Sequence, residues 1–520
     1  MRFFNFVGVP HKIITSLENE NIPFANYIMT FFSAIILRNF IESYSQEANY
    51  FNLPLVAFAY STIHYVLSYI TLALLLISLF YLLARIPVHK AIRVILPGFS
   101  LLLLAPLVDL IITRGEGVNM KYMLPGDDLL YAYLTFFGGL PGVSLGLKCE
   151  IFIALSCFFI YFYTKKISIL RSLLCTWMIY SIIFIWGSSP IYIKWLLEMI
   201  GFDFYHSGDM MIHFYLVLIF ILGVAVSYFA NHNLILLLVK DIRFLRLLHY
   251  ELMLLFGVTL AWVGNVDGIA RQIYLNQVVI INIILCIISI FFSILFSLMM
   301  NNISDIDIDK ICNKNRPLVR GEMDVKFYEK LACFFLVVSL FYASMVNFRA
   351  FLIIGVTMAS YYIYSMPPLR FKRVTLFSKL VISLNSVALI VLGYLIVQED
   401  VYHFPRELFV IYLLGITLSA NLIDLKDIRG DSAVGVMTLP VLLGERQAKL
   451  TIGAATWLTY ISFFSIIKNT YTIPILIGAG AIQFYLITRD RYRELPVLLL
   501  YNLSMVALIL YLIINKSCFN

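Results

Sequence analysis

Long apolar runs, many close to the length of a membrane-spanning helix, recur along most of this chain. A transmembrane helix needs about 20 mainly apolar residues. In the N-terminal half, the runs predict spans at residues 24–37, 53–84, 94–113, 143–163, 173–186 and 211–239. A further apolar stretch at 129–146 is broken by glycines and a proline, and we predict that it does not cross separately.

The C-terminal half continues the same pattern with shorter polar intervals. Its runs predict nine spans, at residues 248–263, 278–300, 331–345, 350–364, 380–397, 408–423, 450–467, 473–487 and 495–514. The charged segment 240–246 separates the two halves, so the predicted domains are 1–239 and 240–520. The predicted fold class is all-α: a polytopic membrane helical bundle in which a nine-helix unit follows about six further transmembrane helices.

Composition agrees with this pattern and excludes a soluble globular class. The chain is 61% hydrophobic and 13% charged, whereas soluble domains have about 25% charged residues. Its seven cysteines are odd in number and have no CxxC spacing, which indicates neither a disulfide framework nor a zinc site. The net charge of +8 is interpreted as topology information in an integral, multi-pass protein surrounded by membrane lipids, so no nucleic-acid partner is expected.

Basic residues are distributed unevenly between the loops of the C-terminal half. The four loops after its second, fourth, sixth and eighth predicted helices carry seventeen Lys and Arg, and the opposite loops carry five. Cytoplasmic loops are enriched in Lys and Arg. The loops after the second and sixth helices, which carry the acidic motifs described next, are therefore predicted to be cytoplasmic.

The first acidic motif follows the apolar run that ends at residue 300. Asn301, Asp305 and Asp309 are spaced i, i+4, i+8, which places them on one face of a helix, while Asp307 points elsewhere. An EF-hand loop begins with a similar DxDxD pattern but needs Gly and Glu at later positions. Lys310 and Arg316 occupy those positions, so calcium binding of that type is not expected.

A second acidic motif recurs about 120 residues later. Asp424, Asp427 and Asp431 are spaced i, i+3, i+7 and again share one face. Mg²⁺ is usually bound by carboxylates, waters and substrate phosphates together. Two facing carboxylate arrays therefore predict Mg²⁺-mediated binding of a diphosphate.

Basic side chains near the motifs fit the same interpretation. Arg316, Arg370 and Lys372 are placed to contact the remaining phosphate oxygens. Asn421, one turn before Asp424, is a candidate substrate contact, with helix packing as the alternative. Other interpretations stay open: solvated helix ends, or a transporter with acidic residues along an ion path.

These motifs resemble those of the UbiA superfamily of intramembrane prenyltransferases. The stretch NNISDIDIDKICNKNRPLVRGEM is similar to the first family motif, and DLKDIRGDSAVGVMTLPVLLGE to the second. The intervening YSMPPLRFKR resembles the family loop between helices four and five. The resemblance covers about residues 240–520, and nothing comparable is found for residues 1–239.

The resemblance implies specific roles, written here as expectations. The family transfers an isoprenyl group from its diphosphate to an acceptor, with Mg²⁺. Asn301, Asp305, Asp309, Asp424, Asp427 and Asp431 would bind the metal and the diphosphate. Arg316, Arg370, Lys372 and Tyr364 would contact substrate, although Tyr364 and Lys372 are eight residues apart where the family pair is four apart. Asn302 stands where many members have Asp.

We therefore expect an integral membrane prenyltransferase with catalytic Asp305, Asp309, Asp427 and Asp431. Its donor would be a prenyl diphosphate and its acceptor a hydrophobic molecule of the quinone-precursor or lipid type, with diphosphate released. The alternative is a transporter or lipid-binding membrane protein on the same scaffold.

Overall fold

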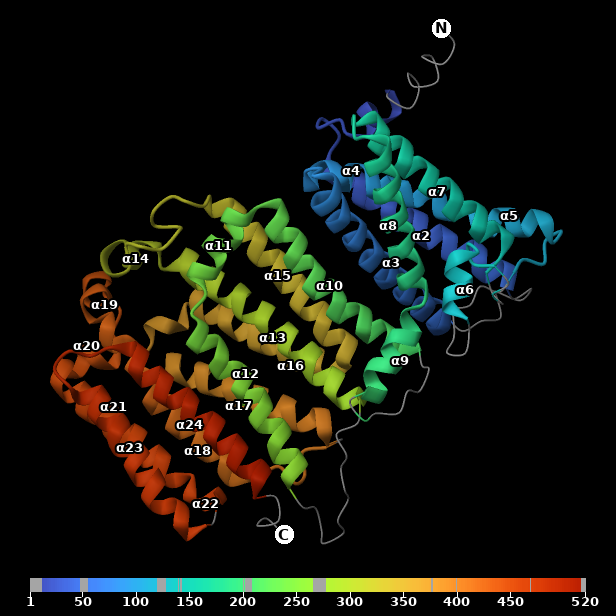
Figure 1. Ribbon diagram of the computed structural model, residues 1–520. Coiled ribbons are helices and arrows are strands. Elements are labelled where there is room, and N and C mark those ends of the chain that lie inside the picture. Colours follow the sequence, from blue (N-terminus) through green and yellow to red (C-terminus); the bar gives the residue numbers. More distant parts are fainter. Residues whose placement is uncertain are drawn as a thin grey trace. The chain divides into compact units, whose positions relative to one another are not determined.

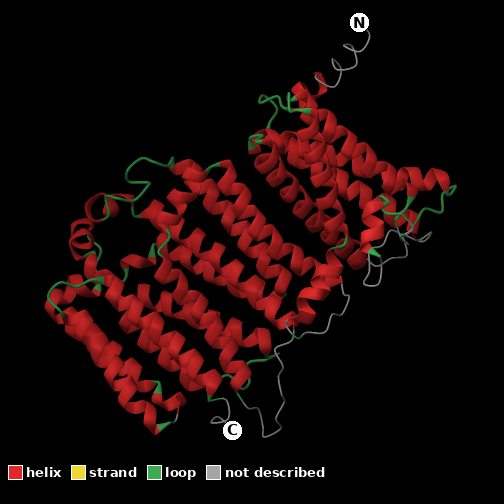
Figure 2. Cartoon of the chain, in the orientation of Figure 1, coloured by secondary structure: helices red, strands yellow, loops and turns green. Residues whose placement is uncertain are grey.

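The computed structural model describes residues 12–46, 55–118, 128–138, 140, 143–199, 201, 208–264, 277–375, 377–398, 400–467 and 469–515. Every regular element in these ranges is a helix, and none is a strand (Figure 2). The chain divides into two compact units, Met1–Ile235 and Leu236–Asn520. The predicted boundary at residue 240 falls in the same helix, α11 (His232–Asp241), as this division.

The N-terminal unit is built from long apolar helices joined by short connections (Figure 1). Its other helices are α2 (Phe24–Gln46), α3 (Leu55–Ala84), α4 (Val88–Gly98), η2 (Phe99–Leu103), α5 (Leu104–Ile112), α6 (Leu129–Leu134), α7 (Leu145–Thr164), α8 (Ile169–Gly187), α9 (Ser189–Met199) and α10 (Gly208–Ala230). Helix α3 contacts α2, α4, α8 and α10 and so lies at the centre of the unit. In the described residues, six segments of this unit have the length and composition to cross a membrane.

Helix α2 extends well beyond the predicted end at residue 37. Arg38 was expected to end the span, but it is 4% exposed and forms an ion pair with Glu42 at 2.6 Å, one turn further on. Its guanidinium also lies over the ring of Tyr65, whose hydroxyl donates to Glu42 at 3.0 Å. Pairing removes most of the cost of burying the charge, so the helix continues.

Two other predicted N-terminal segments can be compared with the structure. In its described residues, stretch 129–146 holds the short helix α6 and the first residues of α7 and contains no candidate span of its own, in agreement with the prediction. The predicted span 211–239 is two helices, because α10 ends at Ala230 and Asn231 caps α11 by accepting from Leu234 N at 3.0 Å.

The described residues of the C-terminal unit form nine long helices, as the apolar pattern predicted. They are α12 (Phe244–Val263), α13 (Gln277–Ser304), α15 (Val325–Val346), α16 (Phe348–Ser365), α17 (Phe377–Val397), α18 (Arg406–Ser419), α21 (Glu445–Ser462), α23 (Ile473–Thr488) and α24 (Glu494–Ile514). The short helices between them are α14 (Ile306–Cys312), η3 (Phe371–Arg373), η4 (Ala420–Lys426), α19 (Ile428–Val434), α20 (Leu439–Leu443), α22 (Phe464–Ile467) and η5 (Thr470–Thr472).

Six of the long helices contact one another in a closed ring. The order is α12, α17, α18, α21, α23, α24 and back to α12. Helix α13 contacts α12 and α17, α16 contacts α17, and α15 packs on α13 and α16. Helices α12 and α17 approach closely at two glycines. A Cβ on Gly257 would lie 1.9 Å from Ile390 O, and one on Gly393 would lie 2.0 Å from Leu254 O. Glycine is needed here because the backbones touch.

Candidate active site

The first acidic motif lies where α13 gives way to the short helix α14. Asp305 interrupts the helix with φ −102° and ψ 10°, yet the helical backbone hydrogen bonds continue across it. Asp305 N donates to Asn301 O at 2.9 Å, and Asp309 N donates to Asp305 O at 2.8 Å. All three side chains therefore line one cavity. Asp307 points away, is 85% exposed and pairs with Lys310 at 2.9 Å.

The second motif repeats this local geometry. Asp427 stands between η4 and α19 with φ −102° and ψ 7°, almost the values of Asp305. Asp424, Asp427 and Asp431 line the same cavity as the first motif. Gly435, at φ +75°, ends α19 in the left-handed conformation that favours glycine. Helices α14 and α19 pack against each other, which brings the two motifs together (Figure 1).

A lysine from the loop after α16 joins the first motif. Lys372 Nζ lies 2.6 Å from Asp305 Oδ1 and 2.9 Å from Ser304 Oγ. Arg370, from the same loop, donates to Ser304 O at 2.6 Å and lies 3.6 Å from Asp305 Oδ1. Lys372 thus faces the cavity, whereas Arg370 holds the end of α13 from behind.

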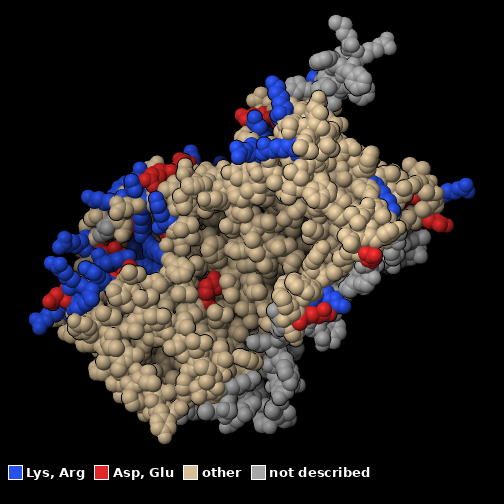
Figure 3. Space-filling view, in the orientation of Figure 1, with Lys and Arg blue, Asp and Glu red and all other residues tan. Residues whose placement is uncertain are grey.

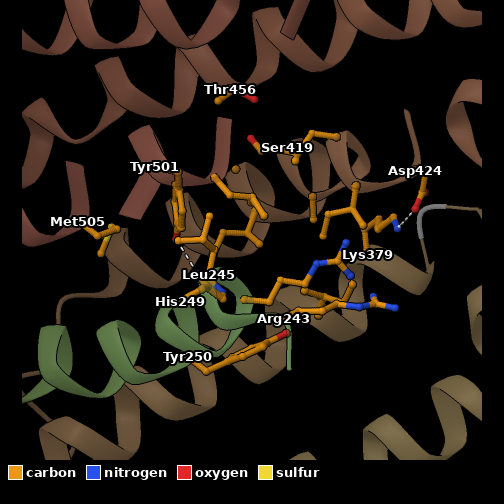
Figure 4. Close-up of a pocket in the computed structure, with 18 of the residues that line it drawn as sticks. Arg243, Leu245, His249, Tyr250, Lys379, Ser419, Asp424, Thr456, Tyr501 and Met505 are labelled. Carbon is orange, nitrogen blue, oxygen red and sulfur yellow. Dashed lines mark hydrogen bonds and ion pairs between the residues drawn. The ribbon is translucent and has the colours of Figure 1, made fainter. Parts of the chain in front are cut away.

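Two further cations face the carboxylates. Lys379, on α17, forms an ion pair with Asp424 at 2.7 Å, drawn as a dashed line in Figure 4. Arg316 pairs with Asp309 and donates to Asn302 Oδ1 at 2.8 Å. Asn302 is 3% exposed, so it fixes the orientation of the Arg316 guanidinium from the protein interior.

Crowding of carboxylates shifts their titration. Burial, with the charges of Asp424 and Asp427, raises the pKa of Asp431 to about 7. Burial also raises the pKa of Asp309 against the opposing charge of Arg316, and that of Asp427 against the charge of Lys426. A bound cation would relieve this repulsion and favour the ionised forms.

The donor set fits a hard divalent cation shared with phosphate oxygens. Among the described residues Asp424 Oδ2 is buried and has no hydrogen-bond partner, so it is available as an oxygen ligand. No group of three His, Cys, Asp or Glu side chains in the described ranges is arranged to hold an ion alone. Mg²⁺ does not need such a cage, because substrate phosphates and waters complete its octahedron.

Behind the motifs the cavity continues into the helical ring. Its volume is about 550 Å³, and side chains of α18, α21, α23 and α24 form its mainly apolar walls. Lining residues on α24 run from Leu498 to Tyr511, about 20 Å of helix at 1.5 Å per residue. In Figure 4 the Lys379–Asp424 pair and Met505 lie at opposite ends of the labelled lining residues. The cavity therefore combines a charged mouth with a long apolar interior.

Most predicted site residues meet at this cavity. Those that line it are Asn301, Asp305, Asp309, Arg316, Tyr364, Lys372, Asp424, Asp427 and Asp431. Two predicted substrate contacts lie elsewhere. Arg370 sits behind Asp305, and Asn421 is 1% exposed and donates to Thr417 O and Leu418 O, both at 3.0 Å. Its amide is therefore engaged by carbonyls at the end of α18, the preceding helix.

Several lining residues were not identified from the sequence. Lys379, Arg243 and Arg246 were interpreted only as loop charges, although Lys379 directly precedes the apolar run 380–397. His249, whose Nδ1 lies 2.9 Å from the Tyr501 hydroxyl, gave no signal because its partner is 252 residues away. Contacts between helices that are far apart in sequence can be identified only once the fold is known.

Comparison with known proteins relates the C-terminal unit to a family. Residues 252–506 match the model of the UbiA prenyltransferase family. Digeranylgeranylglyceryl phosphate synthase of Sulfurisphaera tokodaii is 27% identical over 226 residues, covering 41% of this chain and 80% of that protein. Homogentisate phytyltransferase 1 of Arabidopsis thaliana is 25% identical over 193 residues, covering 35% of this chain and 46% of that protein. The chain thus spans less than half the length of the plant relative.

Similarity to solved structures is weaker. A UbiA homolog from Archaeoglobus fulgidus, bound to GPP and Mg²⁺, has 21% sequence identity and a TM-score of 0.41, over 54% of this chain and 99% of its own. The predicted family, the all-helical membrane fold and the transferase class are confirmed at the level of the family. The C-terminal half of this chain belongs to the UbiA prenyltransferase family.

Proposed function

We propose that the C-terminal unit transfers an isoprenyl group from a prenyl diphosphate to a lipophilic acceptor, with Mg²⁺ and release of diphosphate. In this reaction the C1–O bond to the diphosphate breaks, a bond from C1 to the acceptor forms, and the acceptor loses a proton. One relative is named for a glyceryl phosphate lipid and another for homogentisate. These names support a lipid or quinone-precursor acceptor.

One observation carries this proposal. Two acidic motifs, on α13–α14 and on η4–α19, open together at the mouth of one apolar cavity of about 550 Å³. A diphosphate needs the charged mouth, and a prenyl chain needs the apolar interior. A path for a hydrophilic solute would instead need polar walls along its length.

The side chains at the mouth have distinct tasks in the proposed reaction. Lys372, Lys379 and Arg316 attract the anionic leaving group and stabilise the negative charge that grows on it as the bond breaks. Mg²⁺, when bound to the motif carboxylates, would add charge neutralisation at the diphosphate oxygens. The closed helical ring excludes water from the allylic cation.

Substitution of one aspartate in each motif tests the proposal. We expect Asp305→Asn and Asp427→Asn to lower Mg²⁺-dependent diphosphate release about 100-fold or more, because charge stabilisation at the leaving group is lost. The measurement is diphosphate release by the purified full-length protein, supplied with prenyl diphosphates of several chain lengths and with extracted membrane lipids as acceptors.

Asp307→Asn is the matched control, because Asp307 belongs to the same motif but is exposed and lies outside the cavity. Its activity should equal that of the wild type. Absence of diphosphate release from the wild type with every donor, together with substrate uptake by proteoliposomes, would instead establish a transporter.

A further inference from the structure

A chain of hydrogen bonds within the C-terminal unit runs from the last residue of α11 to the first acidic motif. Asn302, which is 3% exposed, donates from Nδ2 to Asp241 Oδ2 at 3.0 Å and to the Tyr328 hydroxyl at 3.1 Å. Its Oδ1 accepts from Arg316 Nη1 at 2.8 Å, and Arg316 in turn pairs with Asp309. Asp241 is therefore linked to a carboxylate of the motif through two intervening side chains.

The partners of Asn302 determine which way its amide points. A carboxylate only accepts hydrogen bonds and a guanidinium only donates them, so the two must face opposite ends of an amide. The Tyr328 hydroxyl donates its one proton to Asp241 and therefore accepts from Asn302. A flipped amide would set its oxygen against the carboxylate and its NH₂ group against the guanidinium. Asp241 thus fixes the carbonyl of Asn302 toward Arg316.

The orientation of Arg316 follows from these bonds. Its Nη1 makes both side-chain contacts, one to Asn302 and one to Asp309. Nε and Nη2 have no partner among the described residues, and Arg316 lines the cavity into which the motifs open. The Nε–Nη2 edge of a guanidinium offers two parallel N–H groups that match two phosphate oxygens. Holding Nη1 therefore leaves the bidentate edge available to a diphosphate.

Asp309 alone is a poor anchor for this arrangement. Both of its oxygens are engaged, Oδ1 by Asn313 at 2.9 Å and Oδ2 by Arg316. A cation bound at the motif would draw on the same two oxygens and weaken their hold on the guanidinium. Asn302 is neutral and lies in the protein interior, so its bond to Arg316 does not compete with a cation.

We propose that Asp241 is a positioning residue for the diphosphate: through Asn302, it holds Arg316 with its Nε–Nη2 edge toward the leaving group. This inference rests on the proposed function of the unit. Figure 3 shows Lys and Arg side chains gathered over the part of this unit that Figure 1 labels α14 and α19. Positive charge is thus abundant at this end of the unit, and Asp241 contributes direction instead of charge.

The sign of one change in affinity separates positioning from charge. Asp241→Asn removes a negative charge near an anion site, so Coulomb's law alone predicts tighter binding of the anion. A positioning role predicts weaker binding, because a neutral amide can face either end of the Asn302 amide. We expect the Kd of the full-length protein for inorganic diphosphate with Mg²⁺ to rise about fivefold in isothermal titration. An unchanged or lower Kd would overturn the inference.

Glu322→Gln is the matched control for the loss of charge. Glu322 borders the same cavity as Asp241 and Arg316 but forms its ion pair with Arg320, at 3.1 Å. We expect its Kd for diphosphate to equal that of the wild type or to fall. A rise equal to that of Asp241→Asn would attribute the effect to lost charge in general and reject the positioning role.

Exchange of the two groups tests the link through Asn302. Asn302→Asp alone sets two carboxylates against each other and should weaken diphosphate binding. Combined with Asp241→Asn, it restores one amide facing one carboxylate, with the carboxylate now next to Arg316. The Kd of the double variant should return to within about twofold of the wild type. A double variant with wild-type Tm but no recovery of Kd would contradict the inference.

Kinetics distinguish failure of this inference from failure of the proposed reaction. Because charge grows on the leaving group as the bond breaks, Asp241→Asn should lower kcat for diphosphate release and leave the KM for the acceptor within about twofold. Diphosphate binding that depends on Asp241, without any isoprenyl transfer by the wild type, would retain the positioning role and reject the reaction. Isoprenyl transfer with unchanged Kd and kcat in Asp241→Asn would do the reverse.

Discussion

Asp305 and Asp427 occupy equivalent positions, each at a break directly before a helix of seven residues. Their backbone angles agree within a few degrees. Each break turns a carboxylate into the cavity without interrupting the backbone hydrogen bonds from residue to residue. At the scale of single residues, the site therefore contains the same local backbone geometry twice, once in each acidic motif.

Titration of Asp431 should be visible as a pH dependence. Because its pKa is raised to about 7, the carboxyl is protonated below that pH and cannot bind a cation. At limiting Mg²⁺, binding of prenyl diphosphate should strengthen as pH rises from 6 to 8. Isothermal titration at each pH measures this change.

Asp431→Asn removes the titrating group and should flatten that limb of the profile. Asp307→Asn is again the control, and its profile should match the wild type. A wild-type profile that is flat between pH 6 and 8, or that weakens as pH rises, would contradict the assignment.

At the scale of elements, the sequence predicted helices well and their interruptions less well. Apolar runs located the nine long helices that the structure describes in the C-terminal unit, because burial in lipid requires an apolar stretch of roughly fixed length. The residues of the first motif share one face, as their spacing predicted, because the helical backbone hydrogen bonds continue through Asp305.

The errors concern charged side chains that are buried through ion pairs or ring contacts. Arg38 was taken as a helix end although Glu42 lies one turn further along the same helix, and its contact with Tyr65 of α3 could not be identified from the apolar pattern. Lys379 was counted as a loop charge because its ion pair with Asp424 joins α17 to η4. Periodicity along one helix cannot report a partner on another helix.

The contact between α12 and α17 should be sensitive to one methyl group. Gly257→Ala places a Cβ about where Ile390 O now lies, so the helices must separate. We expect a fall in thermal stability of several degrees, as overpacking costs about 1–3 kcal/mol. The measurement is the Tm of the purified protein in detergent.

Gly478→Ala is the matched control, since no atom lies within 4 Å of a Cβ at this position in α23. Its Tm should not fall, because alanine is the better helix former. Equal Tm values for both variants would show that the α12–α17 approach is not close in solution.

At the scale of the whole molecule, two membrane units share one chain, and a function is proposed only for the C-terminal unit. The family match begins at residue 252 and therefore lies within the C-terminal unit. The thirteen candidate spans of the described residues support an integral membrane protein. The side of the membrane that the acidic motifs face is a proposal from the loop charges, and we propose the cytoplasmic side.

Cysteine labelling tests this orientation. In a variant with all native cysteines replaced by serine, Lys326→Cys should resist a membrane-impermeant maleimide applied to intact cells. Tyr402→Cys, which is 85% exposed in the loop between α17 and α18, should react. The reverse result would place the motifs on the outer side.

The apolar lining along α24 has one consequence for any substrate held there. It spans about 20 Å, two thirds of a hydrocarbon core of about 30 Å. A prenyl diphosphate bound along it would lie across the bilayer, with its headgroup at one surface and its tail directed toward the other. The thickness of the membrane would then determine how long a prenyl chain this cavity can hold.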